Sequence, residues 1–98
     1  MNTSFDFIHR DGQSKGVFYI PGKVRKRLAE ITYSKTGKKY IVIEHTFVTN
    51  SLRGKEIGEM LVNKVVKLAE DQNKKIIPIC PYANKLMRND SAYNHILA

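Results

Sequence analysis

The sequence predicts an α+β fold: an antiparallel meander of strands, one strand–helix–strand unit with a buried central helix, and a short C-terminal helix. Two observations predict it. Short segments of alternating apolar and polar residues fill the first half of the chain, and a longer segment with apolar residues three and four apart follows them. The strand after that helix must run parallel to the strand before it, through a right-handed crossover. At 98 residues, we expect a single domain over 1–98.

The first strand patterns are short. Phe5–His9 and Gly16–Ile20 flank the turn pair Asp11-Gly12, and Pro21-Gly22 then interrupts the chain. We therefore expect a hairpin at the N-terminal end.

Two longer strands come next, over Leu28–Ser34 and Tyr40–Val48, with a hairpin turn at residues 35–38 between them. Regular alternation along the second strand predicts which side chains share a face. One face would carry Ile41, Ile43, His45 and Phe47, and the other Tyr40, Val42 and Glu44. His45 would then lie among apolar neighbours, on the opposite face from Glu44.

The apolar period becomes helical from about Leu52 to Gln72. Its stripe consists of Ile57, Leu61, Val65 and Leu68, widened by Met60, Val62, Val66 and Ala69. A short strand follows at Ile76–Ile79, where Pro78 lacks a ladder donor and predicts an edge strand or a splayed one. A weaker helix is expected around Tyr82–Arg88, with a final turn over Ala92–Leu97.

Composition narrows the function. The formal net charge is +8, from 17 Lys and Arg against 9 Asp and Glu, which favours an anionic partner. The single cysteine, Cys80, excludes an intrachain disulfide and an all-cysteine zinc site, and we expect no metal. No apolar run is long enough to span a membrane, and the N-terminus lacks a signal-peptide core. We therefore expect a cytoplasmic protein without membrane contact.

The junction between the second long strand and the helix predicts a phosphate site. Backbone N–H groups at a helix start lack partners and carry partial positive charge, which suits a pyrophosphate. Gly54 and Gly58 remove side chains where a ligand would approach the backbone, and Arg53 either contacts a phosphate or caps the loop.

These same residues carry a family resemblance. His45–Val48 followed by Leu52–Leu61 resembles the acetyl-CoA-binding motif of the GNAT N-acetyltransferase superfamily. Ile76–Tyr82, with its Cys-Pro pair, resembles a compact subfamily of about a hundred residues. In the superfamily pattern Gln/Arg-x-x-Gly-x-Gly/Ala, Arg53 and Gly58 fit, and Glu56 stands where the first glycine belongs. A carboxylate there would stabilise the empty helix start and weaken cofactor binding.

The resemblance implies a GNAT-like fold and an acetyl-CoA-binding protein that transfers an acetyl group to an unidentified amine. The implied cofactor-binding residues are Phe47, Val48, Arg53, Gly54, Lys55, Glu56, Ile57, Gly58, Ile79 and Cys80. Cys80, His45 and Glu44 are the candidate catalytic residues, as acetyl-accepting thiol or general base. Tyr82 or Tyr93 would protonate the departing thiolate. The three candidate catalytic residues also have structural interpretations. His45 would be a core histidine, Glu44 a solvated strand residue, and Cys80 a small buried side chain.

The sequence leaves other functions open. Larger GNAT enzymes insert helices between their first two strands, whereas a tight turn joins these two, so the acceptor site would be shallow. That suits a protein or peptide acceptor, a homodimer that completes the site, or a non-catalytic acetyl-CoA-binding protein. A basic nucleic-acid module is the remaining alternative. Its cations would be Lys23, Arg25, Lys26, Arg27, Lys35, Lys38 and Lys39, and its aromatic residues Tyr19, Tyr33 and Tyr40.

Overall fold

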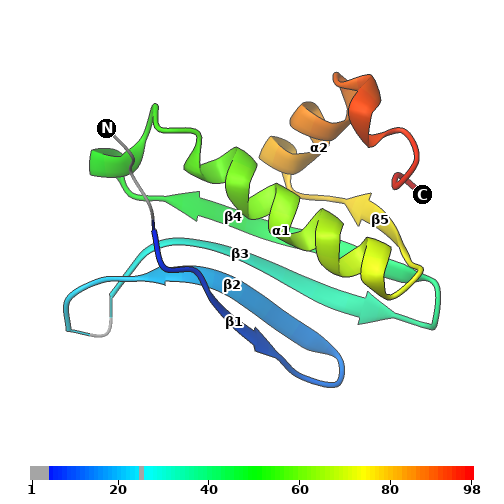
Figure 1. Ribbon diagram of the computed structural model, residues 1–98, viewed down its shortest axis with the longest axis horizontal. Helices are drawn as coiled ribbons and strands as arrows, with labels where there is room; N and C mark the ends of the chain where they lie inside the picture. Colours follow the sequence, from blue (N-terminus) through cyan, green and yellow to red (C-terminus); the bar gives the residue numbers. More distant parts are fainter. Residues whose placement is uncertain (1–4, 25) are drawn as a thin grey trace.

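The computed structural model describes residues 5–24 and 26–98. It has a five-stranded sheet in the order β1-β2-β3-β4-β5, with one helix across a face (Figure 1). The strands are β1 (Ile8–Asp11), β2 (Lys15–Pro21), β3 (Arg27–Thr36), β4 (Tyr40–Val48) and β5 (Lys75–Pro78). The helices are α1 (Ile57–Asp71) and α2 (Pro81–Arg88), with short 3-10 turns η1 (Asn50–Leu52) and η2 (Ser91–Tyr93). Strands β1 to β4 pair antiparallel, and β5 pairs parallel to β4. The predicted α+β class and order of elements are confirmed.

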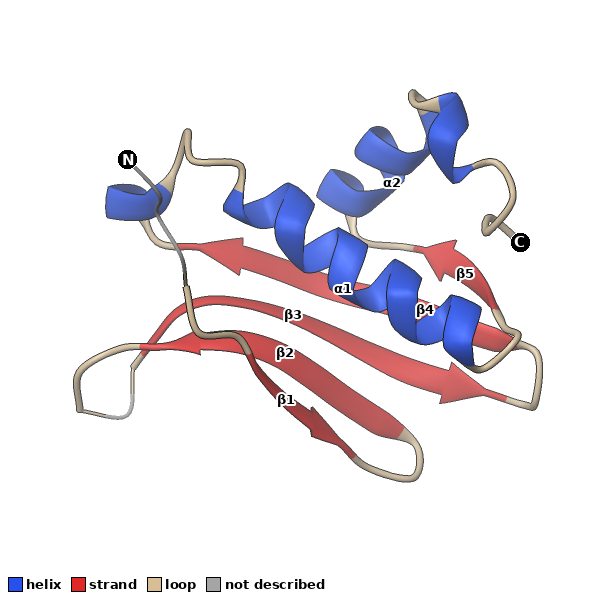
Figure 2. Ribbon diagram, viewed as in Figure 1, coloured by secondary structure: helices blue, strands red, loops and turns tan. Residues whose placement is uncertain are grey.

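The core lies between the sheet and α1, as Figure 2 shows. Strand β3 alternates between the two faces, and Ala29, Ile31 and Tyr33 are fully buried under α1. The apolar stripe of α1 also packs inward, with one exception. Met60 does not widen the buried stripe, because its side chain is 37% exposed to solvent.

The first strand begins later than predicted. β1 starts at Ile8, which pairs with Tyr19, while Phe5 and Phe7 pack against the core as partly buried side chains. The pairing of β2 with β3 becomes irregular between Ile20 and Pro21, so β2 offers no regular edge for residues before Ile8.

A β-bulge in β4 overturns the predicted alternation. Thr32 pairs with His45, yet the next residue of β3, Tyr33, pairs with Ile43, so Glu44 is an extra residue in β4. An inserted residue reverses the faces of everything after it. His45 is therefore exposed and Phe47 lies beside it on the outer face. The prediction that these two share the face of Ile41 and Ile43 is wrong.

The bulge also corrects the predicted separation of Glu44 and His45. Glu44 lines a hollow together with Thr32, and the His45 Nε2 atom lies 3.9 Å from a Glu30 carboxylate oxygen. Glu30 and Thr32 alternate with the buried Ile31, so they face away from α1. Both candidate bases thus lie on the outer face of the sheet rather than on opposite faces.

Strands β4 and β5 part directly before the bulge. Their pairing runs from Tyr40 opposite Lys75 to Ile43 opposite Pro78. The N–H groups of Ile79 and Cys80 then both donate to the Ile43 carbonyl, at 3.1 and 3.2 Å, and no ladder follows among the described residues. The prediction that Pro78 marks an edge strand that splays is confirmed.

The chain end covers the other edge of β5. The Ile76 N–H donates to the Ile96 carbonyl at 2.7 Å, and the Ala98 N–H donates to the Ile76 carbonyl at 2.9 Å. The predicted final turn over Ala92–Leu97 is confirmed: η2 ends at Tyr93, and the N–H groups of Ile96 and Leu97 donate to the Tyr93 carbonyl at 3.0 and 3.2 Å. Leu97 also forms a bridge with Ile76. The predicted C-terminal helix at Tyr82–Arg88 is confirmed as α2.

Candidate functional site

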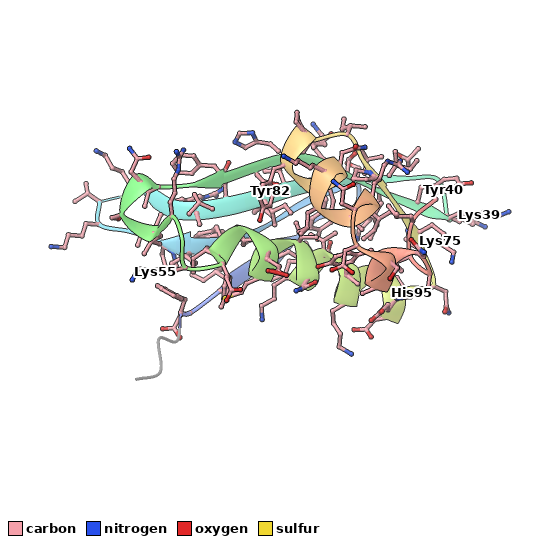
Figure 3. All side chains as sticks on the ribbon, turned by 90° about the horizontal axis from the view of Figure 1, so that it is seen from above. Lys39, Tyr40, Lys55, Lys75, Tyr82 and His95 are labelled. Atoms are coloured by element: carbon pink, nitrogen blue, oxygen red, sulfur yellow. The ribbon has the colours of Figure 1, made fainter. Side chains whose placement is uncertain are left out.

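A cleft of about 540 Å³ lies where the end of β4, the start of α1 and the start of α2 meet. Its lining residues are Thr46, Phe47, Val48, Leu52, Arg53, Gly54, Glu56, Ile57, Gly58, Glu59 and Tyr82. Most of the residues that the sequence predicted for cofactor binding meet here. Lys55, Ile79 and Cys80 do not line the cleft, and Lys55 extends away from the molecule (Figure 3).

The start of α1 supplies the polar side of the cleft. The helix begins at Ile57, later than the predicted Leu52, because Gly54 and Glu56 take left-handed backbone angles with φ of 81° and 62°. The first bond from α1 back to the loop is Met60 N–H to the Glu56 carbonyl, at 3.0 Å. Among the described residues, no N–H group from Gly54 to Glu59 donates to a protein acceptor. Open N–H donors at the positive end of a helix dipole are the features that suit an anion.

Glu56 takes its left-handed angle at a cost that glycine would not have. Its side chain makes no capping hydrogen bond, and it lines the cleft. The superfamily's preference for glycine at this position therefore has a conformational reason as well as the electrostatic one predicted from the sequence.

Arg53 caps the loop from outside. Its Nε atom donates to the Val48 carbonyl at 3.3 Å, which fixes the side chain across the end of β4. The terminal nitrogens make no other hydrogen bond or ion pair in the described part of the chain. Capping and a phosphate contact are thus compatible with one another.

Tyr82 forms the wall opposite the start of α1. A Cβ atom added at Gly58 would lie 2.7 Å from the Tyr82 hydroxyl, so glycine is needed for this close approach. Figure 3 shows Tyr82 at the centre of the molecule, beside the helix start. Burial raises the pKa of Tyr82, and the nearby negative charges of Glu59 and Cys80 raise it further. The phenol is therefore protonated at neutral pH and able to donate a proton.

Cys80 lies behind this wall, 5% exposed, at the N-terminal end of α2. Its Sγ atom lies 3.4 Å from the Thr46 hydroxyl, which joins β4 to α2 across the splay. Burial raises the pKa of this thiol, but hydrogen bonds with Thr46 and with the amides of Ala83 and Tyr82 outweigh it and lower the pKa. The geometry suits a packed thiol that holds the splay as well as a reactive one.

Tyr93, the other predicted acid, does not line the cleft. It is buried, and its hydroxyl donates to the Asn63 side-chain oxygen at 2.8 Å. Burial and the charges of Glu59 and Asp90 raise its pKa. The arrangement is that of a structural tyrosine, and Tyr82 is the residue that reaches the cleft.

The basic nucleic-acid platform does not form. Tyr33 is fully buried, and the guanidinium of Arg27 covers the Tyr19 ring at 4.2 Å. Neither ring is open for base stacking. Tyr40, the third aromatic residue of the predicted platform, is 38% exposed, and Arg25 lies outside the described residues.

The residues that sequence reasoning missed are Thr46, Leu52 and Glu59. Thr46 faces the cleft only because of the bulge, which no alternation pattern signals. Glu59 could have been found from its place in the first turn of α1, where an acid is favourable. No cluster of three metal-ligating side chains and no helix able to cross a membrane occurs in the described residues.

The comparisons agree with this geometry. A family model described as GCN5-related N-acetyl-transferase matches residues 17–96. A GCN5-like protein from Staphylococcus aureus, solved by NMR, is 33% identical with a TM-score of 0.74, over 93% of this chain and 87% of that one.

More distant structures share the fold. A ribosomal-protein-alanine N-acetyltransferase from Brucella melitensis is 18% identical with a TM-score of 0.63, over 89% of this chain and 64% of that one. A GNAT family acetyltransferase from Elizabethkingia anophelis, with acetyl-CoA bound, is 14% identical with a TM-score of 0.56, over 66% and 42% of the two chains.

Proposed function

This chain belongs to the GCN5-related N-acetyltransferase family, and we propose that it moves an acetyl group from acetyl-CoA to an amine at the cleft between β4, α1 and α2. The family resemblance seen in the sequence is confirmed, and with it the acyltransferase class and acetyl-CoA as the acetyl donor. The position of the donor and the roles of individual residues are proposals.

The unpartnered N–H groups from Gly54 to Glu59 carry the proposal. They line one cleft with Arg53, and a pyrophosphate that lay on them would accept several hydrogen bonds at the positive end of α1. No other part of the described chain presents a comparable run of donors on a helix of this length.

The splay between β4 and β5 would hold the pantetheine arm. Beyond Ile43, β4 keeps β3 as its neighbour on one side, and no strand of the described residues pairs with it on the β5 side. Its backbone groups there are available to an extended arm with amide groups, in the way that a sheet edge accepts an added strand. The thioester would then lie near the apex of the splay, beside Cys80 and Tyr82.

The transfer needs one base and one acid. A base takes one proton from the acceptor ammonium, and the amine lone pair forms the C–N bond to the thioester carbon. As the C–S bond breaks, the attached nitrogen releases its second proton to solvent and becomes the amide nitrogen. Glu44 and His45 lie beside the apex on the outer face and are the candidate bases. Tyr82 would give its proton to the departing CoA thiolate. Cys80 does not line the cleft, and we assign it a positioning role: its contact with Thr46 would hold β4 and the start of α2 in place.

An amide NMR titration with acetyl-CoA, beside desacetyl-CoA, tests the cofactor site. We expect saturable amide shifts at Phe47, Val48 and Gly54–Gly58. The shifts at Gly54–Gly58 should be the same for both ligands, because both carry the pyrophosphate. Release of free thiol with an added amine then tests transfer. Shifts confined to the outer face, or none at all, would contradict the proposed seat.

A further inference from the structure

A second hollow, of about 660 Å³, shares no lining residue with the cofactor cleft. Paired residues form its floor: Arg10 pairs with Val17, and Val17 with Thr32. Thr32 pairs in turn with His45, which lies next to the hollow without lining it. Glu44, the bulged residue, lines the hollow beside this row. Because directly paired residues project on the same face of a sheet, the row runs from the Arg10 guanidinium on β1 to His45 on β4, and the Glu44 carboxylate lies beside its far end.

One end of the hollow is cationic. Arg10 donates through Nε to the Tyr19 hydroxyl at 3.2 Å, which orients the guanidinium and leaves its terminal nitrogens available among the described residues. Lys15 lines the same end and makes no ion pair in the described chain. The carboxylate of Asp11 is compensated by Lys35, at 3.0 Å. This end therefore offers two cations to an anionic group.

The other end of the hollow is acidic and lies next to the apex of the splay between β4 and β5. Glu44 makes no hydrogen bond or ion pair among the described residues. It follows Ile43, whose carbonyl accepts the two N–H groups at the apex of the splay. An ammonium group held by Glu44 would thus lie one residue from the proposed position of the thioester.

The span suits a small molecule. Three strand spacings place the β1 and β4 backbones about 14 Å apart. The side chains of Arg10 and Glu44 shorten the distance between their charged groups. Val17 and Thr32 are small, and Arg27, which also lines the hollow, is paired with Glu30 at 3.1 Å.

We propose that the acetyl acceptor is a small amine that carries an anionic group, a carboxylate or a phosphate, on the same molecule. Its amine lies at Glu44 and its anion at Arg10 and Lys15. This inference rests on the proposed acetyl transfer and names the class of acceptor. A neutral amine would bind only at one end, and a long basic peptide would meet repulsion at the other.

Matched pairs of amines test it. The pairs are 4-aminobutyrate with butylamine and O-phosphoethanolamine with ethanolamine, assayed by thiol release at low salt. We expect the anionic member to have a kcat/KM about tenfold higher than its neutral counterpart, from a charge-assisted contact. Whether carboxylate or phosphate is preferred identifies the anionic group.

Variants assign the preference to the hollow. Arg10→Gln and Lys15→Gln should lower kcat/KM for the anionic amines about three- to tenfold and leave the neutral amines unchanged. Lys38→Gln, which removes the same charge from the exposed β3–β4 hairpin, should change neither. In a binding readout, 4-aminobutyrate added to the desacetyl-CoA complex should shift the amides of Val17 and Thr32.

The outcomes separate the two levels of the proposal. Equal use of charged and neutral amines, equal loss on both in Arg10→Gln, or acetyl-CoA binding with no acetylation of any of these amines would overturn the acceptor class. Absence of acetyl-CoA binding would instead overturn the proposed function itself.

Discussion

Replacing Glu56 by glutamine or by glycine separates two effects that meet at this position. The carboxylate repels a bound pyrophosphate, and the left-handed angle of 62° strains any residue with a side chain. Glu56→Gln removes only the charge, whereas Glu56→Gly removes both charge and strain. Asp71→Asn, at the far end of α1, removes a charge of the same sign away from the cleft and serves as the matched control.

The expected stabilities follow from three contributions. A left-handed angle costs a non-glycine residue about 1–2 kcal/mol, and glycine adds about 0.4–1 kcal/mol of unfolded-state entropy. A carboxylate at a helix N-terminus contributes about 0.3–1 kcal/mol, which both variants lose. Glu56→Gln should therefore be less stable than the parent, and Glu56→Gly should be about 1 kcal/mol more stable than Glu56→Gln.

The expected affinities follow from Coulomb's law. Two unit charges about 6 Å apart in water interact by about 0.7 kcal/mol, and salt at 0.1 M halves this roughly. With two charges on a pyrophosphate, both variants should bind acetyl-CoA about threefold more tightly at that salt. Urea unfolding and calorimetric titration measure the two quantities. An unchanged Kd for Glu56→Gln at low salt would refute the electrostatic reasoning, and a glycine variant less stable than the glutamine variant would refute the conformational one.

Three further substitutions test Gly58 and Tyr82, which line the cofactor cleft, and Asp11, which lines the second hollow. Gly58→Ala should keep the fold, since alanine favours helix by about 0.5–1 kcal/mol, but should displace the Tyr82 phenol and lower kcat. Tyr82→Phe should leave the Kd for acetyl-CoA unchanged, lower kcat about 10- to 100-fold, and remove the fall in activity at a pH above the ordinary tyrosine range. Burial raises the pKa of Asp11, but the Tyr33 hydroxyl and Lys35 outweigh it, so the folded pKa is below 3.8. Its stabilisation is present above that pH and lost as pH falls through the folded pKa, so Asp11→Asn should unfold with a weaker acid dependence below pH 4, as measured by circular dichroism.

Local patterns were enough to predict the elements. The alternation of Leu28–Ser34 reported a half-buried strand, the helical stripe reported α1, and Pro78 reported the end of β5. Each of these depends on residues close together in the chain, and so the sequence carries the signal directly.

The details of the site depend on pairing and backbone angles that no local pattern reports. Glutamate rarely adopts a left-handed angle, so the propensity of Glu56 extended the predicted helix back to Leu52. The complete burial of Tyr33 removes an aromatic residue from the predicted basic platform. Tyr82 reaches the cleft through a contact with Gly58 that joins two helices separated by β5.

The bulge at Glu44 connects the two proposals. The extra residue directly follows Ile43, the last residue of β4 that pairs with β5, so the bulge lies where β4 would leave a backbone edge for the cofactor arm. The same residue turns Thr46 toward the cleft and leaves Glu44 and His45 on the outer face beside the hollow. Donor and acceptor would thus approach one point of β4 from opposite faces of the sheet, and the splay after Ile43 is where the amine and the thioester carbon could come into the contact that a direct transfer requires.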